Sequence, residues 1–227
     1  MRSIATRRVH LAEPVSTIDD VSSTTRGRID KRQAILDGAF TVFAKQGYAQ
    51  AGVQDIALEA GVAKPTVYNH MTDKATLFRH AVEAAAIAAL DQRVAALAPL
   101  SDPGDDLPAA LEGVALALLR LHTDSRYCAL RRLLYSEITH FPDILDIVKE
   151  YGLDRLNHAL ADRLARLALA GRLRTTDPDL AAEQFLALIL GPLEARSQMG
   201  TRQLEEAELA TIARTAVETF ARAWLTT

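Results

Sequence analysis

Apolar residues recur every three or four positions through most of this 227-residue chain, and this spacing constrains the fold more than any other feature. Ala, Leu, Arg and Glu dominate the sequence, while Val, Ile, Thr and aromatic residues are sparse. The first group favours helix and the second favours strand. With 49% hydrophobic and 24% charged residues, the chain is neither collagen-like nor wholly disordered. We therefore predict an all-α globular protein without a β-sheet.

The two ends of the chain differ in charge. The formal net charge is −3, but residues 1–80 carry 11 basic and 8 acidic side chains, whereas residues 81–227 carry 15 and 21. A basic front and an acidic body suit a protein that presents one end to a polyanion. Residues 1–27 lack a helical apolar period and are rich in Ser, Thr and Arg, so we predict a flexible basic arm. This arm is either an inert tail or a segment that contacts phosphates.

From Ile29 onward the apolar period predicts a succession of helices. The first of them ends at Gly47, and Asp73 is the predicted N-cap of a long fourth helix. A cluster of Pro, Gly and Asp at residues 101–106 predicts a turn between the front and the body. Pro192 lies within one expected helix and should kink it. The predicted helices are 29–47, 53–60, 64–70, 74–97, 107–123, 126–139, 142–170, 179–199 and 204–225.

Residues 53–70 have the spacing of a helix-turn-helix. Ala57 is small enough for the second short helix to cross close to it, and Gly61 supplies the turn four residues later. Ile56, Val62 and Val67 would form the small core between the two helices. Because this motif commonly places its second helix in the major groove of DNA, the sequence predicts a DNA-binding head.

A set of residues in and around this motif has a recognisable pattern: Gly61-Val62, Thr66-Val67-Tyr68, His70, Lys74 and Leu77. This pattern resembles the DNA-binding domain of the TetR family of transcriptional regulators. The resemblance covers roughly residues 28–88. It implies a three-helix head joined by a long fourth helix to a helical body that binds a ligand and dimerises.

The body resembles, more weakly, the C-terminal domain of AefR-like members of that family. The predicted organisation is an arm over 1–27, a DNA-binding domain over 28–88 with its motif at about 51–70, and a ligand-binding and dimerisation domain over 89–227. The resemblance to AefR-like members rests on residues 133–137, 141–142, 171–174, 177–178 and 181–185.

Carried over position by position, the resemblance makes residues 64–70 the recognition helix. Its N-terminal turn would enter the major groove, with some side chains near base edges and others on phosphates. Base-edge positions are Lys64, Pro65, Thr66 and Asn69; phosphate positions are Tyr68, His70 and Lys74; Arg28 and Gln54 complete the predicted DNA-binding set.

This chain departs from the family pattern at three places. Ala51-Gly52 and Ala63 stand where the family usually has Ser or Thr, which removes a phosphate contact and a helix cap. Met71 replaces the usual Phe in a small core. We expect these changes to affect DNA affinity more than function.

The resemblance also implies dimerisation through the last two helices, whose apolar stripes are of the kind that build a four-helix interface. Internal packing within one chain is the alternative explanation for these stripes. The predicted interface residues are Ala181, Phe185, Leu188, Ile189, Leu193, Ile212, Ala216, Val217 and Phe220.

A second set of residues in the body could line a cavity for a small hydrophobic or amphipathic ligand. Ordinary core or surface positions are the alternative for each of them. This set is Leu119, His122, Leu134, Tyr135, Ile138 and Tyr151.

Other classes of site find little support in the sequence. The six histidines show no metalloprotease spacing, and no nucleophile elbow, Walker loop or dinucleotide loop occurs, so we expect no catalysis, metal or cofactor. Cys128 is the only cysteine and cannot form an internal disulfide, which predicts a reducing, cytoplasmic setting. The apolar runs are too short to cross a bilayer.

Two functions remain. The first is a homodimeric repressor that binds a palindromic operator in double-stranded DNA and is released by a small molecule. The second is a helical dimerisation or scaffold protein whose DNA-binding domain is degenerate. Intact Tyr68, His70 and Lys74 favour the first.

Overall fold

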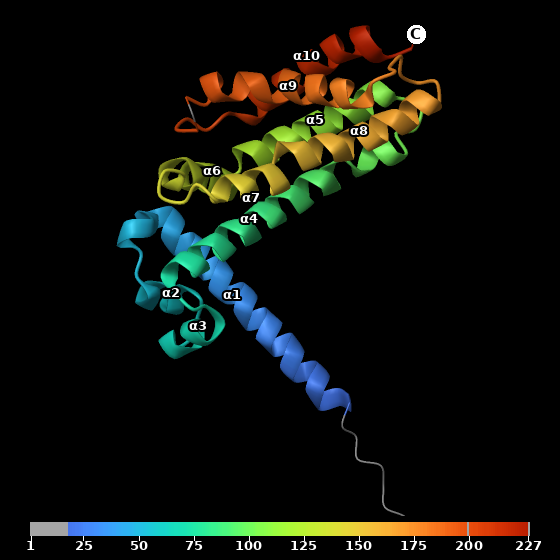
Figure 1. The fold of residues 1–227 in the computed structure, drawn as a ribbon. Helices are drawn as coiled ribbons and strands as arrows, with labels where there is room; N and C mark the ends of the chain where they lie inside the picture. The colour runs from blue at the N-terminus through green and yellow to red at the C-terminus, as the bar shows by residue number, and fades with distance from the viewer. Residues whose placement is uncertain (1–17, 199, 227) are drawn as a thin grey trace, which may run out of the picture.

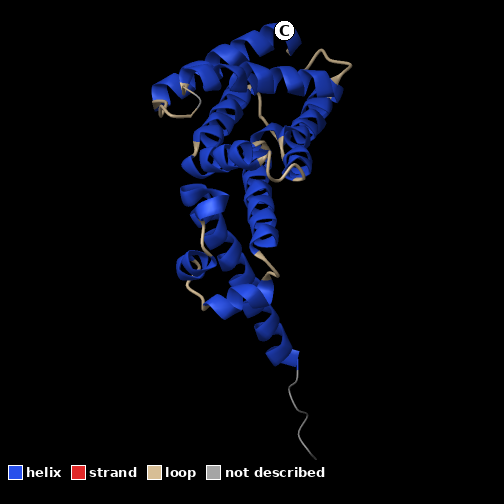
Figure 2. Cartoon of the chain, turned by 60° about the vertical axis from the view of Figure 1, so that its left-hand side comes forward, coloured by secondary structure: helices blue, strands red, loops and turns tan. Residues whose placement is uncertain are grey.

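The computed structural model describes residues 18–198 and 200–226, with side chains from Asp30 onward except those of Val148 and Leu153. Every regular element in these residues is a helix (Figure 2), which confirms the all-α prediction. Within the same residues the only β-type pairing is an isolated antiparallel bridge between Leu173 and Leu225. The elements are α1 (Ile18–Gln50), α2 (Val53–Glu59), α3 (Lys64–His70), α4 (Lys74–Ala96), a 3-10 turn η1 (Ala98–Ser101), α5 (Leu107–Thr123), α6 (Ser125–Glu137), α7 (Ile144–Tyr151), α8 (Leu153–Leu169), α9 (Pro178–Arg196) and α10 (Glu206–Trp224).

Helix α1 begins earlier than the sequence predicted. It starts at Ile18 instead of residue 29, so residues 18–27 of the expected arm are helical. Residues 1–17 of that arm lie outside the described residues. In Figure 1, α1 projects well beyond α2 and α3 at its N-terminal end. Apolar periodicity marks only the helical turns that pack against a core, so it gives no signal for turns that project past one.

The head consists of the C-terminal part of α1 together with α2, α3 and the start of α4 (Figure 1). Gly47 has a φ of 75°, a left-handed conformation that interrupts α1 where the sequence predicted its end. Gly61 has a φ of 65° and turns the chain between α2 and α3, as predicted. The bounds of α2, α3 and α4 agree with the predicted ranges to within one residue.

Gly38 has a packing role that the sequence did not reveal. A Cβ atom at this position would lie 2.9 Å from the backbone nitrogen of Ala60 and 3.0 Å from its Cβ. Helix α1 therefore passes so close to the C-terminal end of α2 that only glycine fits without a shift.

Helix α4 runs from the head into the body (Figure 1). The buried residues form two clusters along it. On α4 the change from one cluster to the other falls between Ala86 and Leu90. The head cluster also contains Leu130 and Leu133 of α6, Phe141 of the following turn and Ile144 of α7. The head is therefore packed directly against α6 and α7 as well as being attached through α4.

In the body, the predicted helix over 142–170 is two helices. The chain leaves helical geometry at Gly152, where ψ is −142°. Both helices pack against α4, and α8 packs in addition against α9. Each helix has its own apolar stripe. In the sequence the two stripes follow each other without a visible break in the helical period, so they predicted a single helix. Helix α9 passes through Pro192 and continues to Arg196.

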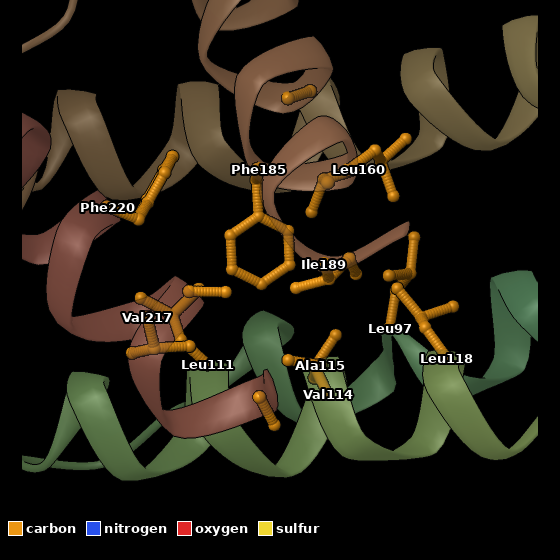
Figure 3. Packing of buried hydrophobic residues seen from close by; sticks show 14 of the residues in the cluster. Leu97, Leu111, Val114, Ala115, Leu118, Leu160, Phe185, Ile189, Val217 and Phe220 are labelled. Atoms are coloured by element: carbon orange, nitrogen blue, oxygen red, sulfur yellow. The ribbon is translucent and has the colours of Figure 1, made fainter. Parts of the chain in front are cut away.

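The predicted dimer residues are mostly interior residues of one chain, which corrects that part of the sequence analysis. Figure 3 shows Phe185, Ile189, Val217 and Phe220 packed among side chains of α5 and α8. The stripes of α9 and α10 face α5 and α8 because these four helices form one core. Leu188 is half-buried, and the eight residues with at most 5% exposure are Ala181, Phe185, Ile189, Leu193, Ile212, Ala216, Val217 and Phe220.

No helix in the described residues is long and apolar enough to span a membrane.

Candidate nucleic-acid interface and body cavity

Helix α3 buries one side chain and presents the others outward. Val67 is 1% exposed and packs into the head core. Tyr68 is 50% exposed, and Thr66 and His70 are partly exposed. Lys64, Pro65 and Asn69 are exposed on the same helix, and Gln54 is exposed at the start of α2. The structure thus brings eight of the nine predicted DNA-binding positions to the surface of the head, counting Lys74; the side chain of Arg28 lies outside the described residues.

Lys74 also has a role within the head. Its ammonium donates a hydrogen bond of 3.2 Å to the carbonyl oxygen of Ala49 and lies 4.7 Å from the centre of the Tyr48 ring. The start of α4 is thereby tied to the last turn of α1. An ammonium has three donors, so this contact leaves two for a phosphate.

The helix caps of the head agree with the sequence, in which Gly and Ala replace the Ser or Thr that the family usually has before α2 and α3. Gly52 before α2 and Ala63 before α3 provide no side-chain cap, while Pro65 occupies the first turn of α3. Asp73 caps α4, accepting a hydrogen bond of 2.7 Å from the backbone N–H of Thr76. This bond lowers the pKa of Asp73 below its usual value.

A cavity of about 440 Å³ lies in the body between α4, α6, α7 and α9. It contains five of the six predicted ligand residues: His122, Leu134, Tyr135, Ile138 and Tyr151. Leu119 was predicted wrongly, because it is fully buried in the body core and does not line the cavity. It belongs to the buried cluster that α5 forms with α4, α8, α9 and α10.

The polar side chains of the cavity were largely missed by the sequence analysis. Arg93 on α4 is 4% exposed, and its guanidinium stacks on the Tyr127 ring with 3.6 Å from Cζ to the ring centre. Arg131 on α6 is paired with Glu194 on α9. A signal for Arg93 existed, since it interrupts the apolar stripe of α4 between Leu90 and Leu97.

His122 is neutral in this environment. Burial, followed by the charges of Arg131 and Arg93, lowers its pKa from 6.5 to about 3. Its Nε2 atom lies 3.0 Å from Nη1 of Arg131, which must be the donor of this bond. The neutral ring therefore serves as an acceptor that holds Arg131 in place.

The turn between α6 and α7 joins the cavity to the head. Ile138 lines the cavity, and Phe141, three residues later, packs 4.7 Å from the Tyr48 ring and 4.8 Å from the Phe78 ring, measured between ring centres. Asp143 pairs with Arg79 of α4, with 2.5 Å between oxygen and nitrogen. One side of this turn thus faces the cavity and the other belongs to the head core.

Two further contacts fix α6 against α1. Arg126 pairs with Asp37 at 2.6 Å, and Glu137 accepts a hydrogen bond of 3.3 Å from the backbone N–H of Tyr48. In the described part of the chain, no group of three or more His, Cys, Asp or Glu side chains is arranged to hold a metal ion.

An exposed recognition helix on a compact head, carried by a helical body with a partly open cavity, defines a DNA-binding transcriptional regulator of the helix-turn-helix class. Comparison with known proteins identifies the family. Residues 35–81 match the model of bacterial regulatory proteins of the tetR family, and residues 109–226 match the AefR-like transcriptional repressor C-terminal domain. The chain belongs to the TetR family, and the scaffold alternative is not favoured.

Individual relatives agree with this assignment. The chain is 30% identical over 171 residues to the HTH-type transcriptional repressor Rv1474c of Mycobacterium tuberculosis, covering 75% of this chain and 83% of the relative. A putative TetR-family regulator from Mesorhizobium loti has a similar structure, with a TM-score of 0.81, 28% identity and coverage of 88% and 98%. The flavonoid-responsive regulator FrrA aligns with a TM-score of 0.68, 26% identity and coverage of 86% and 97%.

Proposed function

We propose that this regulator is a homodimeric repressor whose operator affinity is lowered by a small molecule bound in the cavity. The observation that carries the proposal is the turn between α6 and α7, which lines the cavity through Ile138 and packs into the head through Phe141. A ligand that moves this turn must change the packing of the head. FrrA, a relative described as flavonoid-responsive, gives a precedent for a response to a small molecule.

The dimer seam is proposed on the outer face of α10. Ala207, Thr211, Thr215 and Thr219 are exposed and spaced by four, so they form one ridge of the helix. Each threonine hydroxyl donates to the backbone carbonyl four residues earlier, at 2.6 to 2.9 Å. With their hydroxyls satisfied on the helix, these side chains offer methyl groups to a partner. A ridge of small, uncharged side chains suits a close two-fold contact between copies.

A charge placed on this ridge tests the seam. Thr215→Arg should convert a particle of twice 24.7 kDa into a monomer in analytical ultracentrifugation. Ala88→Arg, at an exposed alanine of α4, is the matched control and should leave the dimer intact. A dimer that persists in Thr215→Arg contradicts this seam.

Within this proposal four side chains of α3 read bases, and the phosphates are held by two others of α3 and one at the start of α4. The base-reading positions are Lys64, Pro65, Thr66 and Asn69, and the phosphate positions are Tyr68, His70 and Lys74. Such a regulator acts on DNA in the cytoplasm and needs no catalytic step.

The test begins with operator fragments selected from genomic DNA by the full chain. Their affinity is then measured by fluorescence anisotropy with and without compounds suggested by the neighbouring genes. We expect release by a compound that binds the cavity, with a loss of affinity of roughly 5- to 150-fold. Sequence-specific binding that no cavity ligand changes would leave a regulator controlled by its abundance alone.

A further inference from the structure

The cavity contains a buried cation, Arg93, that no anion of the described residues pairs with. Arg93 is 96% buried, and among the described residues its Nη2 atom has no hydrogen-bond partner. Buried guanidinium groups are normally paired, because desolvating an unpaired charge is unfavourable. The Tyr127 ring supports one face of the ion, but a stacked ring does not use the N–H donors at the edge of the guanidinium.

The other charges of the lining cancel. Arg131 is paired with Glu194 and also bonded to Nε2 of His122. His122 adds no charge at neutral pH, because its pKa is lowered to about 3. Among the lining residues this leaves the single positive charge of Arg93.

The rest of the wall is apolar. Helix α6 contributes Leu130 and Leu134, and α7 contributes Leu145 and Ile147. A volume of about 440 Å³ is within the range of roughly 300 to 1,000 Å³ that small-molecule sites occupy. The cavity therefore combines an apolar wall with one uncompensated cation at its α4 side.

We propose that the cavity binds an apolar molecule carrying one anionic group, with the anion at Arg93 and the apolar body against α6 and α7. This anion-site proposal depends on the proposed function in one respect only, which is that the cavity is the site where the ligand binds. A charge-assisted bond to a guanidinium recognises carboxylates and sulfonates alike, so the proposal names the charge and not a particular acid.

Two fluorescent probes with the same aromatic skeleton test the charge. 8-Anilinonaphthalene-1-sulfonate carries a sulfonate, and N-phenyl-1-naphthylamine does not. Both are titrated into the full chain without DNA. We expect the wild type to bind the sulfonate at least about tenfold more tightly, and Arg93→Met to lose about tenfold in sulfonate affinity while binding the neutral probe within about twofold of wild type.

Two further variants keep the test decisive. Arg214→Met removes an exposed arginine of α10 outside the lining and should behave as wild type. Glu194→Gln frees the charge of Arg131 and should tighten sulfonate binding even if Arg93→Met fails to fold. Equal affinity of the two probes for the wild type, or unchanged sulfonate affinity in Arg93→Met, overturns the proposal. Sulfonate binding that depends on Arg93 but leaves operator affinity unchanged supports the anion site and counts against ligand-induced release from the operator. Release from the operator by neutral compounds alone supports the proposed function and counts against the anion site.

Discussion

The ring of Phe141, in the turn between α6 and α7, lies 4.8 Å from the ring of Phe78 on α4. Phe78 is fully buried in the head core, and the turn that holds Phe141 also forms part of the cavity wall at Ile138. The cavity and the DNA-binding head therefore share a wall. A ligand need not act through the whole length of α4, because the turn provides a shorter connection.

Phe141→Leu should weaken this connection while the fold persists. The change removes the ring contacts to Tyr48 and Phe78 and should lower the free energy of unfolding by about 1 kcal/mol, as conservative core changes do. The effect of a cavity ligand on operator affinity should fall severalfold. Phe220→Leu, in the body core against Phe185, is the control of similar cost that keeps the ligand effect. An equal loss of ligand response in both variants would assign the effect to stability.

Two glycine-to-alanine substitutions should change the free energy of unfolding in opposite directions. Gly38→Ala places a Cβ within 3.0 Å of Ala60 and should destabilise the protein by about 1 to 3 kcal/mol, with reduced DNA binding. Gly113→Ala lies on α5, where a Cβ meets nothing within 4 Å, and should stabilise by about 0.5 to 1 kcal/mol through helix propensity. Urea unfolding of the two variants measures both. Destabilisation at both sites would show that the contact with Ala60 is not the cause.

Local rules predicted much of the fold, and tertiary packing decided the rest. The positions of Gly61, Asp73 and α3 follow from turn, cap and period signals that need no knowledge of the neighbours. The break at Gly152 and the close contact at Gly38 depend on which helix packs against which, and periodicity contains no such information.

Stability should fall in acid through His122. Its pKa is depressed in the folded state to about 3, compared with 6.5 when unfolded, so the unfolded chain binds the proton more tightly. The contribution is complete above about pH 6.5 and is lost as the pH falls toward 3, by up to roughly 1.4 kcal/mol per unit. His122→Gln should flatten the stability profile in this window, and the same change at the exposed His158 controls for residue type. A profile that stays steep in His122→Gln would assign the acid sensitivity to other groups.

The head residues should divide into two kinds of DNA contact. Lys74→Ala should weaken all operators about equally and reduce the salt slope by about one, because it removes a phosphate contact. It also removes the bond to Ala49, so its thermal unfolding must be measured in parallel. Thr66→Ala and Asn69→Ala should instead change the preference among operators. If all three variants lose affinity without a change in preference, the base-reading positions are assigned wrongly.

The sequence predicted the apolar and aromatic lining of the cavity better than its charged residues. Five of the six predicted ligand residues line the cavity: His122 on α5, Leu134 and Tyr135 on α6, Ile138 in the following turn and Tyr151 on α7. Leu119 is also aliphatic, but it is fully buried in the body core and does not line the cavity. Arg93 stands out in the sequence because it interrupts the apolar stripe of α4, but its burial and its lack of a hydrogen-bond partner at Nη2 are seen only in the structure.

A footprint of the wild-type protein on a selected operator tests the central claim most directly, because it reports how many recognition helices bind and where. Two copies of α3 in a symmetric dimer should protect two related half-sites, with centres one helical turn of ~34 Å apart or a modest multiple of it. Protection of both half-sites to the same degree is the predicted result. Protection of a single asymmetric half-site, or of no defined sequence, would contradict a dimeric operator-binding repressor.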